Sequence, residues 1–209
     1  MSSVQDVYVQ ELTTSQYVKP MEMHYTLHGV RKKWDLLKIH DSVAVLIYNI
    51  TRKVVILVKQ FRPAVFYGAI PASDSKGHID LAQYDPRTGV TLELCAGIVD
   101  KSKSLEEIAQ DEVLEECGYS VPVENLQRVI QYRSSVGISG DKQTVFYVEV
   151  TDAMKVNPGG GNIDEGEFIE VVELTIAEVK KLLAGPEVLS PGGFLFALTW
   201  FLHNKGPFE

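Results

Sequence analysis

Residues 97–119, which read GIVDKSKSLEEIAQDEVLEECGY, are the most informative stretch of the chain. Ser104, with Glu107 three residues later, forms a capping box, and Gly118 has the character of a helix-ending residue, so a helix is predicted over 104–117. Its apolar residues recur at a spacing of four, which predicts a buried stripe made of Ala109, Val113 and Cys117.

Three glutamates lie beside that stripe. Glu112 and Glu116 share a helix face, and Glu115 is close to both. Ionised carboxylates so close together repel one another unless a cation joins them. Oxygen ligands of this kind suit Mg²⁺, with Mn²⁺ as an alternative. A solvated acidic surface is the competing interpretation and prevails for an isolated EXXEE. The preceding glycine loop and the capped helix favour a metal site here.

The whole stretch resembles the Nudix box, a pattern of Nudix hydrolases. The residues in register are Gly97, Glu112, Val113, Glu115, Glu116, Gly118 and Tyr119. Two positions depart, because Lys103 stands where the pattern has Glu and Asp111 where it has Arg. The reversed charges either form a replacement ion pair or are ordinary surface residues.

Strands dense in Val and Ile are expected at 42–48 and 53–59, and further strands at 91–95, 126–132, 143–150 and 168–174. Further helices are expected from the capping box of Thr175 and Glu178, and at 193–203. Gly29 is expected to turn a hairpin, and 68–89 is expected to be a long loop. The order predicts an α/β (α+β) fold: a mixed sheet between helices over 41–209, with 1–40 as a small antiparallel layer.

The resemblance extends to the ADP-ribose pyrophosphatase branch of Nudix hydrolases. LELCAGIVD (92–100) is similar to its LELPAGxxD, with Cys95 in place of proline, and VKQFRPAV (58–65) to a strand with a phosphate-contacting arginine. The segment GISGDKQTVFYV matches the part of the branch that follows its serine-rich loop. The segment DEGEFIEVVEL resembles the branch's acidic loop. The resemblance implies the following roles. Glu165 is the general base, with Glu115 and Glu116 also catalytic; Ala96, Glu112, Glu115, Glu116 and Glu167 hold metal; Arg62, Trp34, Ser139 and Asp141 bind substrate.

Two of these residues have alternatives. Arg62 could equally form a salt bridge at the edge of the core, and Trp34, expected to stack on a nucleobase, could be ordinary packing. The long loop, EECGY, the GGG run and a late W-F-L helix resemble the UDP-sugar pyrophosphatases of animals. This likeness implies cleavage of UDP-glucose to UMP and glucose 1-phosphate by a homodimer with exchanged N-terminal layers. An ADP-ribose pyrophosphatase and a catalytically silent nucleotide-sugar sensor remain as alternatives.

Composition narrows the class further. The chain has 209 residues, 45% hydrophobic content and a net charge of −8, which argues against nucleic-acid binding and adsorption to anionic membranes. Cys95 and Cys117 lack metal-type spacing and are expected to be reduced core thiols. No apolar run reaches the roughly 20 residues that span a bilayer. We therefore expect a cytoplasmic protein.

Overall fold

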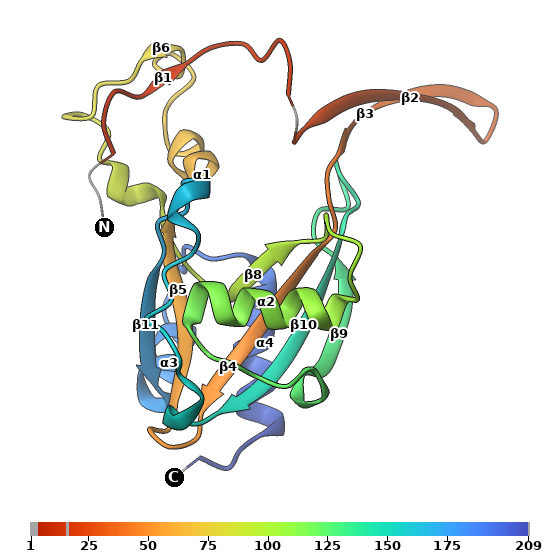
Figure 1. Ribbon diagram of the computed structural model, residues 1–209. Coiled ribbons are helices and arrows are strands. Elements are labelled where there is room, and N and C mark those ends of the chain that lie inside the picture. The colour runs from red at the N-terminus through yellow and green to blue at the C-terminus, as the bar shows by residue number, and fades with distance from the viewer. Residues whose placement is uncertain (1–3, 16, 209) are drawn as a thin grey trace.

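The computed structural model describes residues 4–15 and 17–208, apart from the side chain of Glu165. A seven-stranded mixed sheet forms its body (Figure 1). Five strands follow one another in the order β11-β5-β4-β10-β9, while β7 pairs with β5 and β8 with β4. The strands are β4 (Ser42–Asn49), β5 (Val54–Phe61), β7 (Val90–Glu93), β8 (Cys95–Ile98), β9 (Gln127–Arg133), β10 (Lys142–Val150) and β11 (Glu170–Thr175). The predicted mixed sheet is confirmed.

The two central strands separate along their length. β4 pairs with β5 over residues 47–49 only, and its opposite end, 42–45, pairs with β8 instead. β5 pairs with β7 over 58–61. The expected strand 91–95 is therefore two short strands broken at Leu94, and the second continues into the segment expected to be a loop. The break carries the chain from β5 to β4, directly before α2 (Leu105–Cys117).

Helices cover both faces of the sheet, as its apolar strands require. In β4, alternate side chains point to opposite faces: Val43, Val45 and Ile47 pack in the cluster under α2, and Ala44, Leu46 and Tyr48 in the opposite one. The second cluster includes buried side chains of α3 (Ile176–Leu183) and α4 (Gly192–Asn204). Figure 1 shows α2 in front of the sheet and α4 behind it. The helix–sheet–helix arrangement is that expected from the element order.

The predicted helix ends are confirmed. Ser104 and Glu107 form both hydrogen bonds of the capping box, and Gly118 closes α2 in the left-handed conformation, at φ 75°. Thr175 and Glu178 cap α3 in the same way. Ala109, Val113 and Cys117 are fully buried. The face of α2 that carries the glutamates is thereby fixed relative to the sheet.

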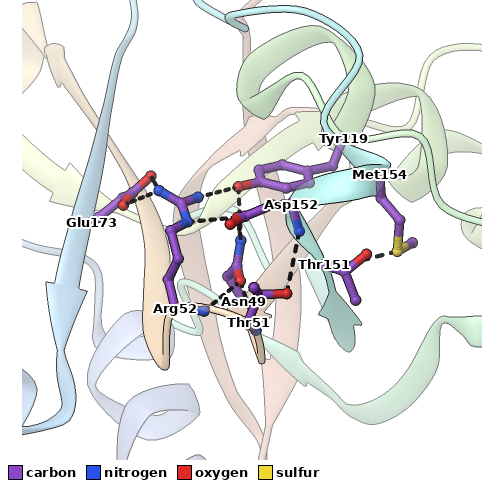
Figure 2. A network of polar contacts seen from close by, with 8 residues as sticks. All are labelled: Asn49, Thr51, Arg52, Tyr119, Thr151, Asp152, Met154 and Glu173. Carbon is purple, nitrogen blue, oxygen red and sulfur yellow. Dashed lines mark hydrogen bonds and ion pairs between the residues drawn. The ribbon is translucent and has the colours of Figure 1, made fainter.

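A polar network holds the chain that follows α2 (Figure 2). Arg52, in the turn after β4, donates to Asp152 at 2.7 Å and to the Tyr119 hydroxyl at 2.7 Å. It also binds Glu173 of β11, and Asn49 donates to Asp152 at 2.7 Å. Tyr119, the apolar end of the box motif, is thus tied to the turn between the central strands.

The N-terminal residues contribute no described strand to the main sheet. β2 (Lys19–Leu27) and β3 (Val30–Lys38) form the expected hairpin, with His28 and Gly29 at positive φ in its turn. Figure 1 shows the hairpin extending away from the body. The expected antiparallel layer of residues 1–40 is not continuous, because β1 (Tyr8–Val9) pairs with β6 (Gly77–His78) and not with the hairpin.

The segment 68–89 is less of an open loop than expected. It contains β6 and the 3₁₀ turn η1 (Pro86–Gly89), and it begins where α1 (Pro63–Gly68) ends. Phe66, Ile70 and Ile79 form a small core of their own, against which Val7 and Val9 pack. The N-terminal segment and this loop therefore stabilise each other.

Among the described residues, no helix combines the length and the apolar composition that a membrane span requires.

Candidate active site

Glu116 is the most buried carboxylate on α2, with 3% of its surface exposed. Its Oε2 accepts a hydrogen bond of 2.9 Å from the backbone N–H of Ala96, in β8. Burial raises its pKa to about 8, and the charges of Glu112 and Glu167 add to the effect, while the Ala96 N–H and the Cys95 thiol act in the opposite direction. A carboxylate held in this way is costly to ionise without a cation.

Glu112 lies one turn earlier on α2, directly over Gly97. A Cβ atom built on Gly97 would lie 2.1 Å from Oε1 of Glu112, so only glycine leaves room for this carboxylate. Burial raises the pKa of Glu112 to about 7, followed by the charges of Glu115 and Glu167. The glycine that begins the box motif therefore has a steric function here.

The predicted metal ligands are brought to one region. Ala96 contacts Glu116 directly, and the charge of Glu167 acts on both Glu112 and Glu116. Glu115 is exposed at the rim. Among the described residues, however, no three His, Cys, Asp or Glu side chains are arranged to hold a metal ion by themselves. That geometry suits Mg²⁺, which commonly binds one or two carboxylates and completes its shell with water and substrate phosphates.

The donor chemistry fits a divalent cation. Glu112 and Glu116 offer carboxylate oxygens whose pKa values burial raises to about 7 and about 8, and the ion pairs of the described residues include neither of them. A cation that displaced those protons would relieve the mutual repulsion of the carboxylates. These two residues are the pair best placed to bind it.

Arg62 is at the N-cap of α1, not within a strand as expected, because β5 ends at Phe61 and Pro63 starts the helix. Its Nε and Nη2 donate to the two carboxylate oxygens of Glu93 at 2.8 and 2.7 Å. Burial alone would raise the pKa of Glu93, but the hydrogen bonds and charge of Arg62 outweigh it and lower that pKa. The salt-bridge alternative is therefore realised.

The guanidinium of Arg62 also lies near the carboxylates of Glu116 and Glu167. Its pKa is raised first by the Glu93 hydrogen bonds and then by nearby charges, including those of Glu116 and Glu167. Because Nη1 takes no part in the pair with Glu93, an ion pair and a phosphate contact are compatible. Glu93 is the site residue that sequence reasoning missed. A single acidic residue inside the apolar run TLELC was the available signal, since a buried charge needs a partner.

The other predicted substrate-binding residues lie on β3 and in the loop between β9 and β10, which a hydrogen bond joins. Asp141 is buried and accepts hydrogen bonds from Ser134 and Ser139, which closes the loop between β9 and β10. The indole N–H of Trp34 donates to the Gly137 carbonyl of that loop at 2.8 Å. Trp34 is half exposed, so ordinary core packing does not describe it. Its role towards a nucleobase stays a prediction.

The acidic loop lies beyond the end of α2. Glu165 ends the 3₁₀ turn η4 (Ile163–Glu165), and its side chain lies outside the described residues. The Glu167 carboxylate accepts a hydrogen bond from the N–H of Asn162 at 3.3 Å, and the Glu167 N–H donates to the Asn162 carbonyl at 3.1 Å. These bonds hold the base of the turn closed.

Lys103 and Asp111, the two departures from the box motif, form an ion pair of 2.5 Å. Both side chains are partly exposed, at 45% and 36%. Of the two interpretations of these positions, the structure favours the replacement pair, which joins the loop before α2 to the helix itself.

Comparison with known proteins found relatives along the entire chain, although no family model matches it. A uridine diphosphate glucose pyrophosphatase NUDT14 of Bos taurus is 42% identical over 217 aligned positions, covering 99% of this chain and 98% of its own. The protein of the same name from Mus musculus has the same identity and coverage. A GDP-mannose pyrophosphatase of Cronobacter sakazakii is 32% identical over 71% of this chain and 67% of its own.

Proposed function

We propose, since the chain belongs to the Nudix hydrolase family, that it hydrolyses the diphosphate bond of UDP-sugars, chiefly UDP-glucose, to UMP and glucose 1-phosphate. The observation that carries the proposal is the pair of carboxylates formed by the half-buried Glu112 and the buried Glu116, on one face of a capped helix near Arg62. The names of the two mammalian relatives support the choice of UDP-glucose.

The reaction adds water to one phosphorus of the diphosphate and releases the other phosphate with its sugar or nucleoside. A divalent cation, Mg²⁺ or alternatively Mn²⁺, would offset phosphate charge and lower the pKa of a bound water. In this proposal Glu112 and Glu116 bind the cation, helped by Glu115, Glu167 and the carbonyl of Ala96. In an extended strand the N–H and C=O of a residue point to the same edge, so the Ala96 carbonyl is expected on the edge from which the Ala96 N–H reaches Glu116.

The remaining groups act on the water and the phosphates. Glu165 takes the proton of the attacking water, a contribution of about 10²–10⁴-fold for a well-placed general base. Arg62, oriented by Glu93, donates to a phosphate oxygen through a charge-assisted hydrogen bond. Trp34 stacks on the uracil, and Ser139 with Asp141 shapes the loop that supports it.

A homodimer is part of the proposal. One face of the β2–β3 hairpin carries Met21, Met23, Leu27, Val30 and Trp34, all exposed, and we call it the apolar hairpin face. An isolated two-stranded hairpin is marginally stable in water, and an apolar surface of this kind favours a partner. Residues 19–38 contain five Lys or Arg and two Asp or Glu in a chain of net charge −8, so the acidic body of a second copy suits them.

Two free, buried cysteines support a reducing compartment, and we propose the cytoplasm.

The function is tested with purified protein, Mg²⁺ and separate additions of UDP-glucose, ADP-ribose and GDP-mannose, with the products resolved by anion-exchange chromatography. UMP and glucose 1-phosphate in equal amounts, lost on addition of EDTA, are expected. AMP formation that exceeds UMP formation would favour the ADP-ribose alternative, and no turnover of any substrate would favour the sensor.

A further inference from the structure

The glycine run Gly159–Gly161, which precedes the acidic loop, is hydrogen-bonded to the C-terminus of α2. Gly160 donates its N–H to the Glu116 carbonyl at 2.9 Å, and Gly161 donates to the Glu115 carbonyl at 3.3 Å. The last carbonyls of a helix lack partners within the helix, and here the glycine run supplies them. These two bonds tie the run to the end of the helix.

The segment that leads to the run is also fixed. The N–H groups of Val156 and Asn157 both donate to the Gly118 carbonyl, at 2.8 and 3.4 Å. Asp152, a few residues earlier, is held by Arg52 in the network of Figure 2. The glycine run therefore reaches α2 from a supported direction.

Gly160 also closes the base of the acidic loop. Its carbonyl accepts a hydrogen bond from the N–H of Ile169 at 3.1 Å. The loop that carries Glu165 and Glu167 therefore runs from Gly160 to Ile169, and this bond joins its two ends. Within the loop, Ile163 and Phe168 are exposed, at 70% and 56%. Any movement of the loop over substrate must then occur between Gly160 and Ile169, on a base that stays with the helix.

The backbone conformation explains why glycine is needed. Gly160 has φ 121°, which side chains of L residues rarely adopt, although a Cβ there would meet its nearest neighbour, the Ile169 carbonyl, at an ordinary 3.7 Å. Gly159 differs, because its Cβ would lie 2.4 Å from the Glu116 carbonyl. A side chain at Gly160 disturbs the peptide orientation, and one at Gly159 pushes the run off the helix.

We propose that Gly160 is a positioning residue of the hydrolase: it fixes the acidic loop to the turn of α2 that presents Glu116, and so sets the loop glutamates against the helix glutamates. This inference rests on the proposed function, because the relevant geometry is that of the general base and the metal-binding carboxylates. The contact joins the two carboxylate-bearing segments through backbone atoms alone.

The test compares Gly160→Ala with Gly77→Ala, a matched control whose φ of 76° is also positive and whose Cβ would meet nothing within 4 Å. Gly160→Ala should lower kcat for UDP-glucose by about 10–100-fold, the range that misplacement of a catalytic group by about 1 Å produces. KM should change by less than about threefold, since uniform binding is retained. Gly77→Ala should keep wild-type kcat.

A double-mutant cycle with Glu167→Gln separates positioning from general damage. If Gly160 acts through the loop glutamates, Gly160→Ala should cost much less in the Glu167→Gln background than in the wild type. The proposal would be overturned if the double variant lost kcat by the full product of the two single-variant factors. It would also be overturned if Gly160→Ala had the same kcat as Gly77→Ala.

A measurement on the wild type covers the case in which Gly160→Ala does not fold. The Gly160 amide should be protected from hydrogen exchange, because it is bonded to Glu116; rapid exchange in the folded protein would overturn the docking. A wild type that hydrolyses no nucleotide sugar would instead refute the proposed function. An active wild type with an unaffected Gly160→Ala variant would refute the positioning role alone.

Discussion

The carboxylate of Glu116 is bonded to the backbone N–H of Ala96 at 2.9 Å, which joins the glutamate-bearing face of α2 to strand β8. The residue is held at its side-chain carboxylate by β8 and at its backbone carbonyl by Gly160. A residue fixed at both ends orients its free oxygen with little loss of side-chain entropy on binding a cation.

Glu116→Gln should therefore abolish turnover without unfolding the protein. The glutamine oxygen can still accept from Ala96, so the join between α2 and β8 remains, but the anionic ligand is lost. We expect kcat to fall more than about 100-fold, beyond the 10–100-fold typical of residues that only support a metal ligand. Steady-state kinetics and circular dichroism check both parts. Full activity would remove Glu116 from the site.

Gly97→Ala tests the steric function of the box glycine. The new methyl group would overlap the end of the flexible Glu112 side chain, so that the carboxylate moves while the fold is retained. The concentration of Mg²⁺ needed for half-maximal activity should rise about 10–100-fold. Gly68→Ala, whose Cβ would meet nothing within 4 Å, is the control and should behave as the wild type. A wild-type metal requirement in Gly97→Ala would contradict the assignment of Glu112.

The ion pair between Arg62 and Glu93 predicts a dependence of stability on pH. The pKa of Glu93 in the folded protein lies below its ordinary value of 4.5, so its stabilising effect is present above pH 4.5 and is lost as the pH falls through the lowered pKa. Arg62→Met leaves the Glu93 carboxylate buried without its partner. Because the Arg62 side chain is 44% exposed, we expect a loss of about 1–3 kcal/mol at pH 7, below the range for fully buried pairs.

That loss should shrink towards pH 4, since protonated Glu93 no longer needs a positive partner. Urea unfolding of wild type and Arg62→Met at several pH values measures the difference. The double variant Arg62→Met/Glu93→Gln should recover part of the stability at pH 7, since it removes the buried charge. A loss that does not vary with pH would show that the side chain of Arg62 stabilises the fold by packing and not through Glu93.

Much of this site could be predicted from the sequence, and the limits have a physical cause. The ends of α2 and the shared face of Glu112 and Glu116 follow from spacings of three and four residues, which helix geometry fixes locally. The pairing of Arg62 with Glu93 spans 31 residues, and the bond from Trp34 to Gly137 spans 103. Such contacts depend on how the strands are arranged, which no local pattern contains.

The same limit explains the misplaced elements. The pairing of β1 with β6 involves two residues in each strand, too few to leave an alternating pattern. Arg62 was expected on a strand because VKQFRPAV resembles a strand of the ADP-ribose pyrophosphatase branch; Pro63, which is favoured at the first position of a helix, carried the contrary signal. The break at Leu94 arises because β4 and β5 diverge, a property of the whole sheet.

The apolar hairpin face predicts how the proposed dimer can be disrupted. Met23→Glu places a charge on that face, whereas Thr26→Glu places the same charge on the opposite face of the same strand. Sedimentation velocity should give a dimer for the wild type and for Thr26→Glu, and a monomer for Met23→Glu. A monomeric wild type would refute the dimer, and a dimeric Met23→Glu variant would move the interface elsewhere.

The reversed pair of Lys103 and Asp111 can be exchanged for the charges that the Nudix box usually has. In Lys103→Glu the new carboxylate faces Asp111, and in Asp111→Arg the new guanidinium faces Lys103, so each single variant sets like charges where the ion pair of 2.5 Å stood. Because both side chains are partly exposed, each single variant should lower the free energy of unfolding by about 0.5–1 kcal/mol.

The double variant restores opposite charges in the usual orientation, and its stability and kcat should match the wild type. Thermal unfolding at low and high salt measures this, since screening should reduce the deficit of the single variants. Losses that add in the double variant would mean that the two residues stabilise the loop and α2 independently.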